Sequence, residues 1–445
     1  MKAKKPGVSG VLVVFSIILA LSIVLNVMQF SNSPAPCAPE VVLAPAPECP
    51  PQECPPSTLT PVPSIANTST LIYNSSFEGG TLYKTKNGKF NVLDLHGSYR
   101  EMGRQYGYLL RDDLNSMYLE TAEDLRQRGM SDEEQVEAAE EFYRKYPERF
   151  KEVILGMSET SGLTLGEQIR LNAAIFSLFG VYFSQATPGE PGAGCSGTAF
   201  WGPYSKDGKL YFGRNWDASQ DMMGPYIKYL TLAVYHPEGS GNTVANLEYA
   251  GEVYTETAMN DGGIFLELNN GAQSDPSSYP QRVDAAVELL AFMFDYSTLE
   301  GLEAAFETTR ASEAYVVQVA DSSAAYSFEW SSAYGVHRRS ENVSGLLVTY
   351  NSFVPPYPDG WEVPPPLAAD TRRDNLLALA NSPEYKGQMD VEKMKEFLSV
   401  RWEDGGATAF GTNFQVIAVP EDRLMWIKGI GYSGWEEVDL GPLFD

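Results

Sequence analysis

The sequence predicts an α+β fold with antiparallel sheets, preceded by a membrane-spanning helix and an extended stalk. Three observations support this prediction. Residues 11–30 are almost continuously apolar, residues 100–179 show helical spacing of apolar side chains, and residues 230–428 contain short strand-like runs separated by turns and helices. Strands in groups with helices between them are typical of a layered α+β domain.

The apolar run at residues 11–30 is long enough to cross a bilayer as a helix. Three lysines precede it, and the tendency of positive residues to stay in the cytoplasm places the rest of the chain outside the cell. A cleaved signal peptide is the alternative, because the small residues at 31–35 are compatible with processing. The run is longer than a usual signal core, so we expect residues 1–30 to anchor a single-pass protein in the cell membrane, with an extracytoplasmic globular part.

Residues 31–70 are rich in proline and small polar side chains, which favours an extended stalk with polyproline-II character. The stalk contains Cys37, Cys49 and Cys54, which leaves one cysteine for the rest of the chain. An odd number of cysteines outside the cytosol indicates a disulfide to a second chain, and Cys49 and Cys54 are close enough to form a small loop. A disulfide-linked dimer is therefore one expectation, and free thiols are the alternative.

The composition excludes some classes of partner. The 445 residues carry a formal net charge of −26, which argues against nucleic-acid binding because phosphates need lysine and arginine partners. The three histidines, His96, His236 and His337, are scattered through the sequence with a spacing unlike that of zinc sites. We therefore expect no metal and no cofactor.

The segment that follows the stalk, residues 71–194, is expected to be mostly helical. Ser131 and Glu134 form a capping-box pattern that opens one of its helices. Gly103 and Gly107 lie one helical turn apart and are expected to allow close helix packing. The predicted elements are a strand at 91–95 and helices at 100–115, 131–146, 147–160 and 165–179.

A run rich in glycine and proline, from Thr187 to Gly194, directly precedes Cys195. Gly194 has no side chain, so the Gly194–Cys195 peptide can be approached closely and can adopt strained backbone angles. Such a bond is a target for attack by the adjacent thiol. Attack would release Cys195 as a new N-terminus.

Cys195 also begins a predicted β-hairpin. The runs 198–201 and 210–212 are rich in aromatic and β-branched residues, and an Asp-Gly step between them favours a tight turn. Antiparallel pairing would bring Cys195 close to Arg214 and Asp217 at the end of the second run. There Arg214 would favour the thiolate, and Asp217 could hold a nearby ammonium or amide. Cys195 is thus the candidate nucleophile, and a buried structural thiol is the alternative.

Beyond the hairpin, the chain is predicted to consist of short strands with helices between them. Strands are expected at 230–235, 243–249, 263–268, 314–318, 325–330, 345–349, 414–419 and 423–428, and helices at 282–294, 299–308 and 370–380. Asn269 and Asn351 each follow one of these strands. A side-chain amide at such a place can stabilise an oxyanion, although asparagine at a strand end is also common in turns. Only the combination with Cys195 favours the first interpretation.

Four motifs in this order resemble the cysteine N-terminal nucleophile hydrolases. They are Gly194-Cys-Ser-Gly197, Gly213-Arg-Asn-Trp-Asp217, Met259-Asn-Asp-Gly-Gly-Ile-Phe-Leu-Glu-Leu-Asn269 and Val348-Thr-Tyr-Asn351. More narrowly, the chain looks like the acyl-coenzyme A:isopenicillin N acyltransferase group, which is related to choloylglycine hydrolases and penicillin V acylases. Two earlier segments, Leu95–Gly107 and Ile154–Leu163, resemble the pro-region of that group. The resemblance extends from about Leu71 to the C-terminus.

The resemblance implies a four-layer αββα fold that is made as an inactive precursor and cut before Cys195. Residues 71–194 would then be a helical pro-region and residues 195–445 the catalytic domain. Cys195 would be the nucleophile, and its freed α-amino group the general base. The later arginine of the family falls at Arg373, and Arg372 matches the pattern equally well.

The resemblance also implies roles for four further residues. Asp217 would hold the freed amine, and Arg214 would support the thiolate. Asn269 would form the oxyanion hole, and Asn351 would be the second polar residue of the site. The chain departs from the family pattern in Ser196, where many relatives carry threonine, and in its anchor and stalk.

The chemistry of a free α-amine agrees with this assignment. Such an amine titrates near pH 8, so it can take the proton of a thiol and return it to the leaving group. Attack on an amide gives a thioester, which water resolves in a hydrolase and an amine resolves in an acyltransferase. Because a coenzyme A thioester is not expected outside the cell, we favour hydrolysis of small non-peptide N-acyl amides. The sequence is less compatible with a papain-like protease, which needs a positioned histidine, or with a non-catalytic membrane-tethered surface protein.

Overall fold

The computed structural model describes residues 69–185, 194–339, 343–409 and 411–445. The predicted anchor, nearly all of the predicted stalk and its three cysteines lie outside the described residues, as does most of the glycine- and proline-rich run before Cys195. Within the described ranges, no helix combines the length and the apolar character that a membrane crossing requires.

The described residues form two sheets and a set of helices. The strands are β1 Leu71–Phe77, β2 Gly80–Thr85, β3 Asn91–Gly97, β4 Ser196–Phe200, β5 Tyr211–Asp217, β6 Leu230–Pro237, β7 Val244–Tyr249, β8 Thr257–Asn260, β9 Phe265–Asn270, β10 Tyr315–Ala320, β11 Ala325–Ser331, β12 Gly335–Arg338, β13 Leu346–Thr349, β14 Thr412–Val419, β15 Leu424–Gly429 and β16 Glu436–Asp439. The helices are α2 Tyr99–Leu109, α3 Arg111–Gln127, α4 Asp132–Arg144, α5 Glu148–Thr160, α6 Leu165–Asn172, α7 Ala174–Gln185, α8 Gln220–Met223, α9 Ala285–Asp295, α10 Leu299–Thr308, α11 Arg372–Ala380, α12 Val391–Ser399 and α13 Gly441–Phe444.

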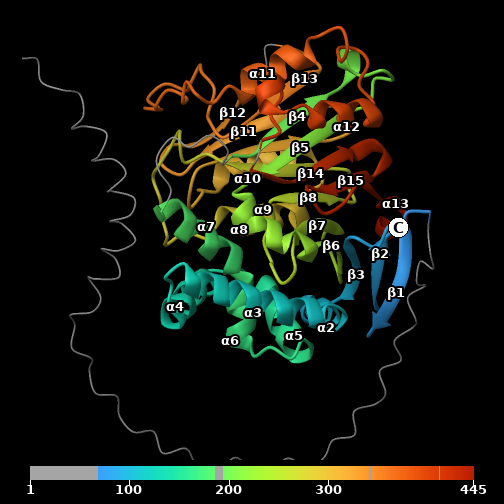
Figure 1. Ribbon diagram of the computed structural model, residues 1–445, viewed down its shortest axis with the longest axis vertical. Helices are drawn as coiled ribbons and strands as arrows, with labels where there is room; N and C mark the ends of the chain where they lie inside the picture. Colours follow the sequence, from blue (N-terminus) through green and yellow to red (C-terminus); the bar gives the residue numbers. More distant parts are fainter. Residues whose placement is uncertain (1–68, 186–193, 340–342, 410) are drawn as a thin grey trace, which may run out of the picture. The chain divides into compact units, whose positions relative to one another are not determined.

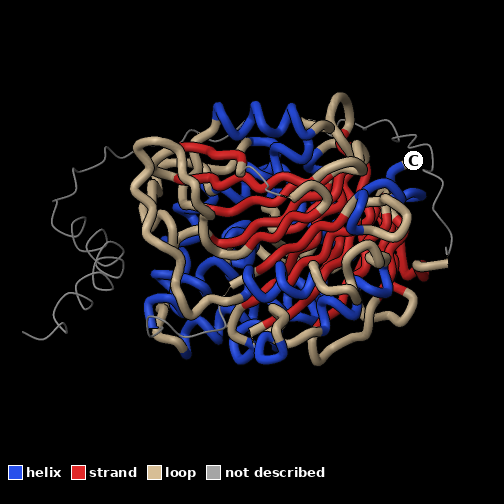
Figure 2. The backbone as a smooth tube through the Cα atoms, turned by 90° about the horizontal axis from the view of Figure 1, so that it is seen from above, coloured by secondary structure: helices blue, strands red, loops and turns tan. Residues whose placement is uncertain are grey.

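Two sheets lie face to face, with helices on their outer faces (Figures 1 and 2). The first has ten strands in the order β1-β2-β3-β6-β7-β8-β9-β10-β11-β12, and the second has six in the order β13-β4-β5-β14-β15-β16. Helices α11 and α12 pack against the six-stranded sheet, whereas α2, α9 and α10 pack against the ten-stranded sheet. The predicted α+β class and its four layers are therefore confirmed for the described residues.

The six-stranded sheet and its helices share one apolar core. Phe200 of β4 and Ile417 of β14 point into it, together with Met394 and Phe397 of α12, and all four side chains are buried. Burying a side chain of this size stabilises the fold by about 1.5–3 kcal/mol. This core holds the strand that follows Cys195 against the helical layer.

Local signals in the sequence are found where they were expected. Ser131 and Glu134 form the capping box at the start of α4. On α2, a Cβ atom at Gly103 or Gly107 would collide with backbone of α5, at the carbonyl of Val153 or of Met157. The close packing predicted for these two glycines is therefore confirmed.

The segment between the stalk and Cys195 is less helical than predicted, because residues 71–97 form β1, β2 and β3. These strands belong to the ten-stranded sheet, in which β3 pairs in parallel with β6. Described residues before 178 and after 194 fall in the same compact unit, while the end of α7 falls in another. Strands that precede Gly194 (β1, β2 and β3) and strands that follow it (β6 to β12) thus belong to the same ten-stranded sheet.

Candidate active site

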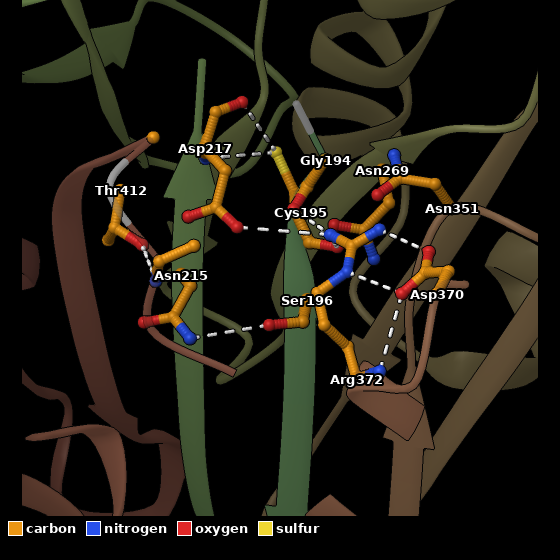
Figure 3. A network of polar contacts seen from close by, with 12 residues as sticks. Gly194, Cys195, Ser196, Asn215, Asp217, Asn269, Asn351, Asp370, Arg372 and Thr412 are labelled. Carbon is orange, nitrogen blue, oxygen red and sulfur yellow. Dashed lines mark hydrogen bonds and ion pairs between the residues drawn. The ribbon is translucent and has the colours of Figure 1, made fainter. Parts of the chain in front are cut away.

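The predicted hairpin is present and positions Cys195. β4 and β5 pair antiparallel, with Ser196 opposite Asn215. Cys195 therefore lies beside the end of β5, where the backbone N–H of Asp217 donates to its Sγ at 3.5 Å and the Sγ lies 3.9 Å from the Asp217 carbonyl oxygen (Figure 3). The sequence predicted this proximity from antiparallel pairing alone.

Cys195 is a free cysteine with part of its surface exposed, but its sulfur lies in desolvated surroundings. Burial raises the pKa of Cys195 to about 12, and the charge of Arg214 opposes this increase. The thiol is therefore protonated at neutral pH in the uncut chain. Attack by the sulfur requires a group that takes this proton.

Arg214 lies on β5 between the two sheets, and its side chain is fully buried. One terminal nitrogen donates to the carbonyl oxygen of Leu268 at 2.9 Å, and the other donates to the carbonyl oxygen of Glu256 at 2.5 Å and to the hydroxyl of Thr257. Nε lies 3.2 Å from Oε2 of Glu267. These contacts fix the positively charged guanidinium of Arg214 near the sulfur of Cys195.

Glu267 is a residue of this network that the sequence analysis missed. Its buried Oε1 accepts hydrogen bonds from Nδ2 of Asn269 at 3.1 Å and from the hydroxyl of Thr349 at 3.3 Å. Burial raises the pKa of Glu267 to about 7, and Arg214 opposes this increase. Side chains two residues apart on a strand share a face, so the pairing of Glu267 with Asn269 was readable from β9.

Gly197 allows this network to reach the strand of the nucleophile. A Cβ atom at Gly197 would collide with the side-chain oxygens of Gln318 and Glu267. Glycine is therefore required at this position of the Gly-Cys-Ser-Gly motif for packing between the sheets.

The two asparagines predicted for the site lie close together (Figure 3). The Nδ2 of Asn269 donates to Oε1 of Glu267 at 3.1 Å and to the hydroxyl of Thr349 at 3.3 Å, so an oxyanion would take the place of the Thr349 hydroxyl. The Nδ2 of Asn351 donates to the carbonyl oxygen of Asn270 at 2.8 Å. A Cβ atom at Gly194 would collide with Oδ1 of Asn351, so the structure brings this side chain directly against the residue before Cys195.

Arg372, the first residue of α11, lies on the Gly194–Cys195 peptide. Its buried guanidinium donates to the carbonyl oxygen of Gly194 and, at 3.1 Å, to the carbonyl oxygen of Cys195. Asp370 holds this guanidinium with two hydrogen bonds of 2.8 and 2.5 Å (Figure 3). The sequence analysis missed Asp370.

The structure brings Arg372 to the site, whereas the sequence analysis favoured Arg373. Successive side chains of a helix point about 100° apart, because 3.6 residues form one turn. Arg373 is the next residue of α11 and is only half-buried. Arg372 therefore replaces Arg373 in the candidate site.

The backbone of Asp217 contacts the sulfur, and its carboxylate Oδ2 lies 3.8 Å from a terminal nitrogen of Arg372. Burial raises the pKa of Asp217 to about 7, and Arg372 opposes this increase. A carboxyl group that titrates near neutrality can both accept and return a proton. Asp217 is thus suited to take the proton of Cys195 before any amine is free.

The sequence matches no protein-family model and no curated protein. Among solved structures, it is similar to a Caenorhabditis elegans N-acylethanolamine-hydrolyzing acid amidase ortholog, with 18% identity, a TM-score of 0.39, and coverage of 55% of this chain and 100% of that chain. It is also similar to conjugated bile acid hydrolase from Clostridium perfringens, with 13% identity, a TM-score of 0.41, and coverage of 56% of this chain and 94% of that chain. Penicillin V acylase from Agrobacterium tumefaciens has 13% identity, a TM-score of 0.38, and coverage of 55% of this chain and 86% of that chain. The last two represent classes that the sequence motifs resemble, but at these scores we infer function from the site.

Proposed function

We propose that the chain is an amidohydrolase that cuts its own Gly194–Cys195 bond and then cleaves N-acyl amides through a thioester on Cys195. The observation that carries this proposal is the guanidinium of Arg372, which donates to the carbonyl oxygen of Gly194. Attack on that carbonyl places negative charge on the oxygen, where the donor already lies.

The self-cleavage follows from the contacts around the bond. As the Cys195 sulfur bonds to the carbonyl carbon of Gly194, the thiol proton passes to Asp217 and then to the departing nitrogen. The carbon–nitrogen bond breaks and leaves a thioester between Gly194 and Cys195. Water hydrolyses this thioester, which gives a carboxylate on Gly194 and frees both the thiol and the α-amine of Cys195.

The freed α-amine replaces Asp217 as the proton acceptor in turnover. It titrates near pH 8, and the Asp217 carboxylate beside it favours its ammonium form. Arg214 favours the thiolate, and the N–H of Asn269 that now donates to Thr349 would turn to the oxyanion of the substrate amide. The acyl group forms a thioester on the sulfur, and water releases it as a carboxylic acid.

The residues after Asn351 favour an apolar acyl group. Phe353 is buried beside Ala314 and Val316 of the ten-stranded sheet, and Tyr357 and Trp361 pack against this cluster. These aromatic side chains follow the candidate site directly in the chain, so they favour a small amide with an apolar acyl part.

An acyltransferase that passes the acyl group to an amine is the second candidate, since an amine can resolve the same thioester. We include in the proposal an extracytoplasmic membrane location and a stalk-linked dimer. The apolar residues 11–30 support the first, and the odd number of stalk cysteines supports the second. Membrane extraction and a non-reducing gel test these two points.

The full chain, purified after folding, tests self-cleavage. We expect two fragments, the second beginning with Cys195 by N-terminal sequencing, and a single uncut chain for Cys195→Ala. Cys195→Ser retains a weaker nucleophile, so we expect slower cleavage. A wild-type chain that stays joined at Gly194 under folding conditions would refute the proposal.

Turnover is measured by mass spectrometry on a panel of N-acyl amides, with and without an added amine. A free carboxylic acid as the main product in both cases supports the hydrolase. A new amide that forms only with the added amine indicates the acyltransferase. A cut chain that turns over none of the panel and takes no acyl label on Cys195 would contradict both.

A further inference from the structure

A group of potential metal ligands lies away from Cys195, where β3 and β6 pair. The parallel register places His96 directly opposite His236, and Asp94 lies two residues before His96 on the same face of β3. Nε2 of His96 and Nε2 of His236 each lie 2.9 Å from the same atom, Oδ1 of Asp94. Residues 140 positions apart in the sequence thus direct three ligand atoms to one point.

These three atoms are buried, and both imidazole nitrogens converge on the single oxygen Oδ1 of Asp94. Asp94 is only 5% exposed, so its oxygen has little access to water. The two imidazole rings stack with centroids 4.1 Å apart and an interplanar angle of 17°.

We propose that Asp94, His96 and His236 bind a divalent transition-metal ion of the Zn²⁺ class. Two imidazole nitrogens and one carboxylate oxygen are a common donor set for such ions. Tetrahedral ligand atoms about 2.1 Å from an ion are separated by about 3.4 Å, so each nitrogen moves about 0.5 Å away from the Asp94 oxygen to admit the ion. Each ring turns about its Cβ–Cγ bond to direct its lone pair at the ion, and water completes the coordination.

Neighbouring groups already fix the ligands. Oγ1 of Thr243 lies 3.3 Å from Nδ1 of His236, and an Nδ1–H donated there leaves Nε2 with the lone pair that a metal needs. Gln105 of α2 accepts from the backbone N–H of His96 at 2.9 Å and donates to its carbonyl oxygen at 2.8 Å. These contacts hold both strands in register around the site.

The site joins the two sides of Gly194, because Asp94 and His96 precede it and His236 follows it. An ion bound there stabilises the folded chain whether or not the chain is cut, since it binds the folded state and not the unfolded one. The inference therefore does not depend on the proposed enzymatic function.

The test measures Co²⁺ and Zn²⁺ binding to the full chain purified without a histidine tag. We expect about one Co²⁺ per chain at this site, with the visible absorption of nitrogen and oxygen ligands and without the intense charge-transfer bands of a thiolate. These bands separate it from ions on Cys195 or on the stalk cysteines. Zn²⁺ should displace the Co²⁺ and raise the unfolding temperature.

Matched variants assign the ligands. His96→Ala, His236→Ala and Asp94→Asn should each weaken binding by more than about 100-fold, while Thr243→Val, which removes an outer-shell contact, should weaken it by about 10-fold. His337→Ala is the control, because His337 pairs with Glu329 on other strands and should bind as wild type. Wild-type protein with no thiolate-free Co²⁺ site, or a site that His96→Ala and the milder Thr243→Val both leave unchanged, would overturn the proposal.

Discussion

Cys195 lies between two buried arginine–carboxylate pairs, which we call its inner and outer flanks, and the two pairs are suited to different tasks. On the inner flank, Arg214 and Glu267 pair between the sheets, and Arg214 also donates to the carbonyls of Glu256 and Leu268 and to the hydroxyl of Thr257. On the outer flank, Arg372 and Asp370 pair at the start of α11, and Arg372 donates to the carbonyl of Gly194. Both arginines are buried, but only the outer one touches the Gly194–Cys195 peptide. We therefore expect loss of the inner pair to act mainly on stability and loss of the outer pair to act mainly on the rate of the proposed cleavage.

The largest expected effect is on the inner flank. Arg214→Gln breaks a buried ion pair and removes the guanidinium donors to the carbonyl oxygens of Glu256 and Leu268, so we expect it to lower the free energy of unfolding by about 3–5 kcal/mol. Denaturant titration in the uncut Cys195→Ala background measures this. Arg338→Gln removes an exposed pair with Glu303 and is the control, with an expected loss below about 1 kcal/mol. Equal losses in the two variants would remove the distinction between the flanks.

The next effect is on the outer flank and concerns rate. Arg372→Gln removes the donor to the Gly194 oxygen and should slow self-cleavage by about 10²–10³-fold. Its neighbour gives a matched control, since Arg373→Gln should leave the rate within about threefold because helix geometry directs its side chain elsewhere. The measurement is the time course of fragment formation after refolding. Slower cleavage in Arg373→Gln than in Arg372→Gln would reverse the assignment.

The third prediction concerns pH and compares one carboxyl group from each flank. Burial raises the pKa of Asp217 and of Glu267 to about 7 each, well above the value of about 4 expected for the unfolded chain. The folded state thus binds more protons than the unfolded state between pH 4 and 7, and stability falls as pH rises through this range. Each group contributes up to about 1.4 kcal/mol per pH unit.

Isosteric amides isolate the two contributions. In the Cys195→Ala background, Asp217→Asn and Glu267→Gln should each reduce the loss of stability between pH 4 and 7, as measured by denaturant titration across that range. A pH dependence that neither variant changes would show that these carboxyl groups ionise at ordinary values in the folded chain.

The smallest expected effect tests how the inner flank is held. Thr349→Val removes the hydroxyl that donates to Glu267 at 3.3 Å and should lower the free energy of unfolding by about 1 kcal/mol. Self-cleavage should continue at close to the wild-type rate, because Thr349 does not touch the bond. A cleavage defect as large as that of Arg372→Gln would place Thr349 in the chemistry instead.

The parts of the site that the sequence predicted are those set by local pairing. Antiparallel pairing of β4 and β5 determines that Cys195 meets Asp217, although residues 201–210 join the strands in place of the predicted tight turn. Asn269 lies within β9, and Asn351 follows the end of β13. The choice between Arg372 and Arg373 depends on where α11 begins, and a shift of one residue turns the side chain by about 100°. Sequence patterns do not define helix starts to that precision.

Contacts across distant strands were out of reach for a different reason. The histidines at 96 and 236 meet only because β3 and β6 pair in parallel, and nothing near either residue specifies that partner or register. β1 was missed because the polar residues Asn74, Ser75 and Ser76 interrupt its apolar run and it lies exposed at the edge of the sheet. In the six-stranded sheet, β16 was missed because its sequence, Glu-Glu-Val-Asp, is mostly acidic.

The place of β3 inside the ten-stranded sheet has a consequence for a chain severed at Gly194. Its first portion would remain woven between β2 and β6, so the mature protein would be a heterodimer of two unequal subunits. Separating the two subunits would break the backbone hydrogen bonds between β3 and β6 in the middle of the sheet, which would unfold the protein. If the residues before β1 anchor the protein in a membrane, the subunit that carries Cys195 would be attached only through these backbone hydrogen bonds.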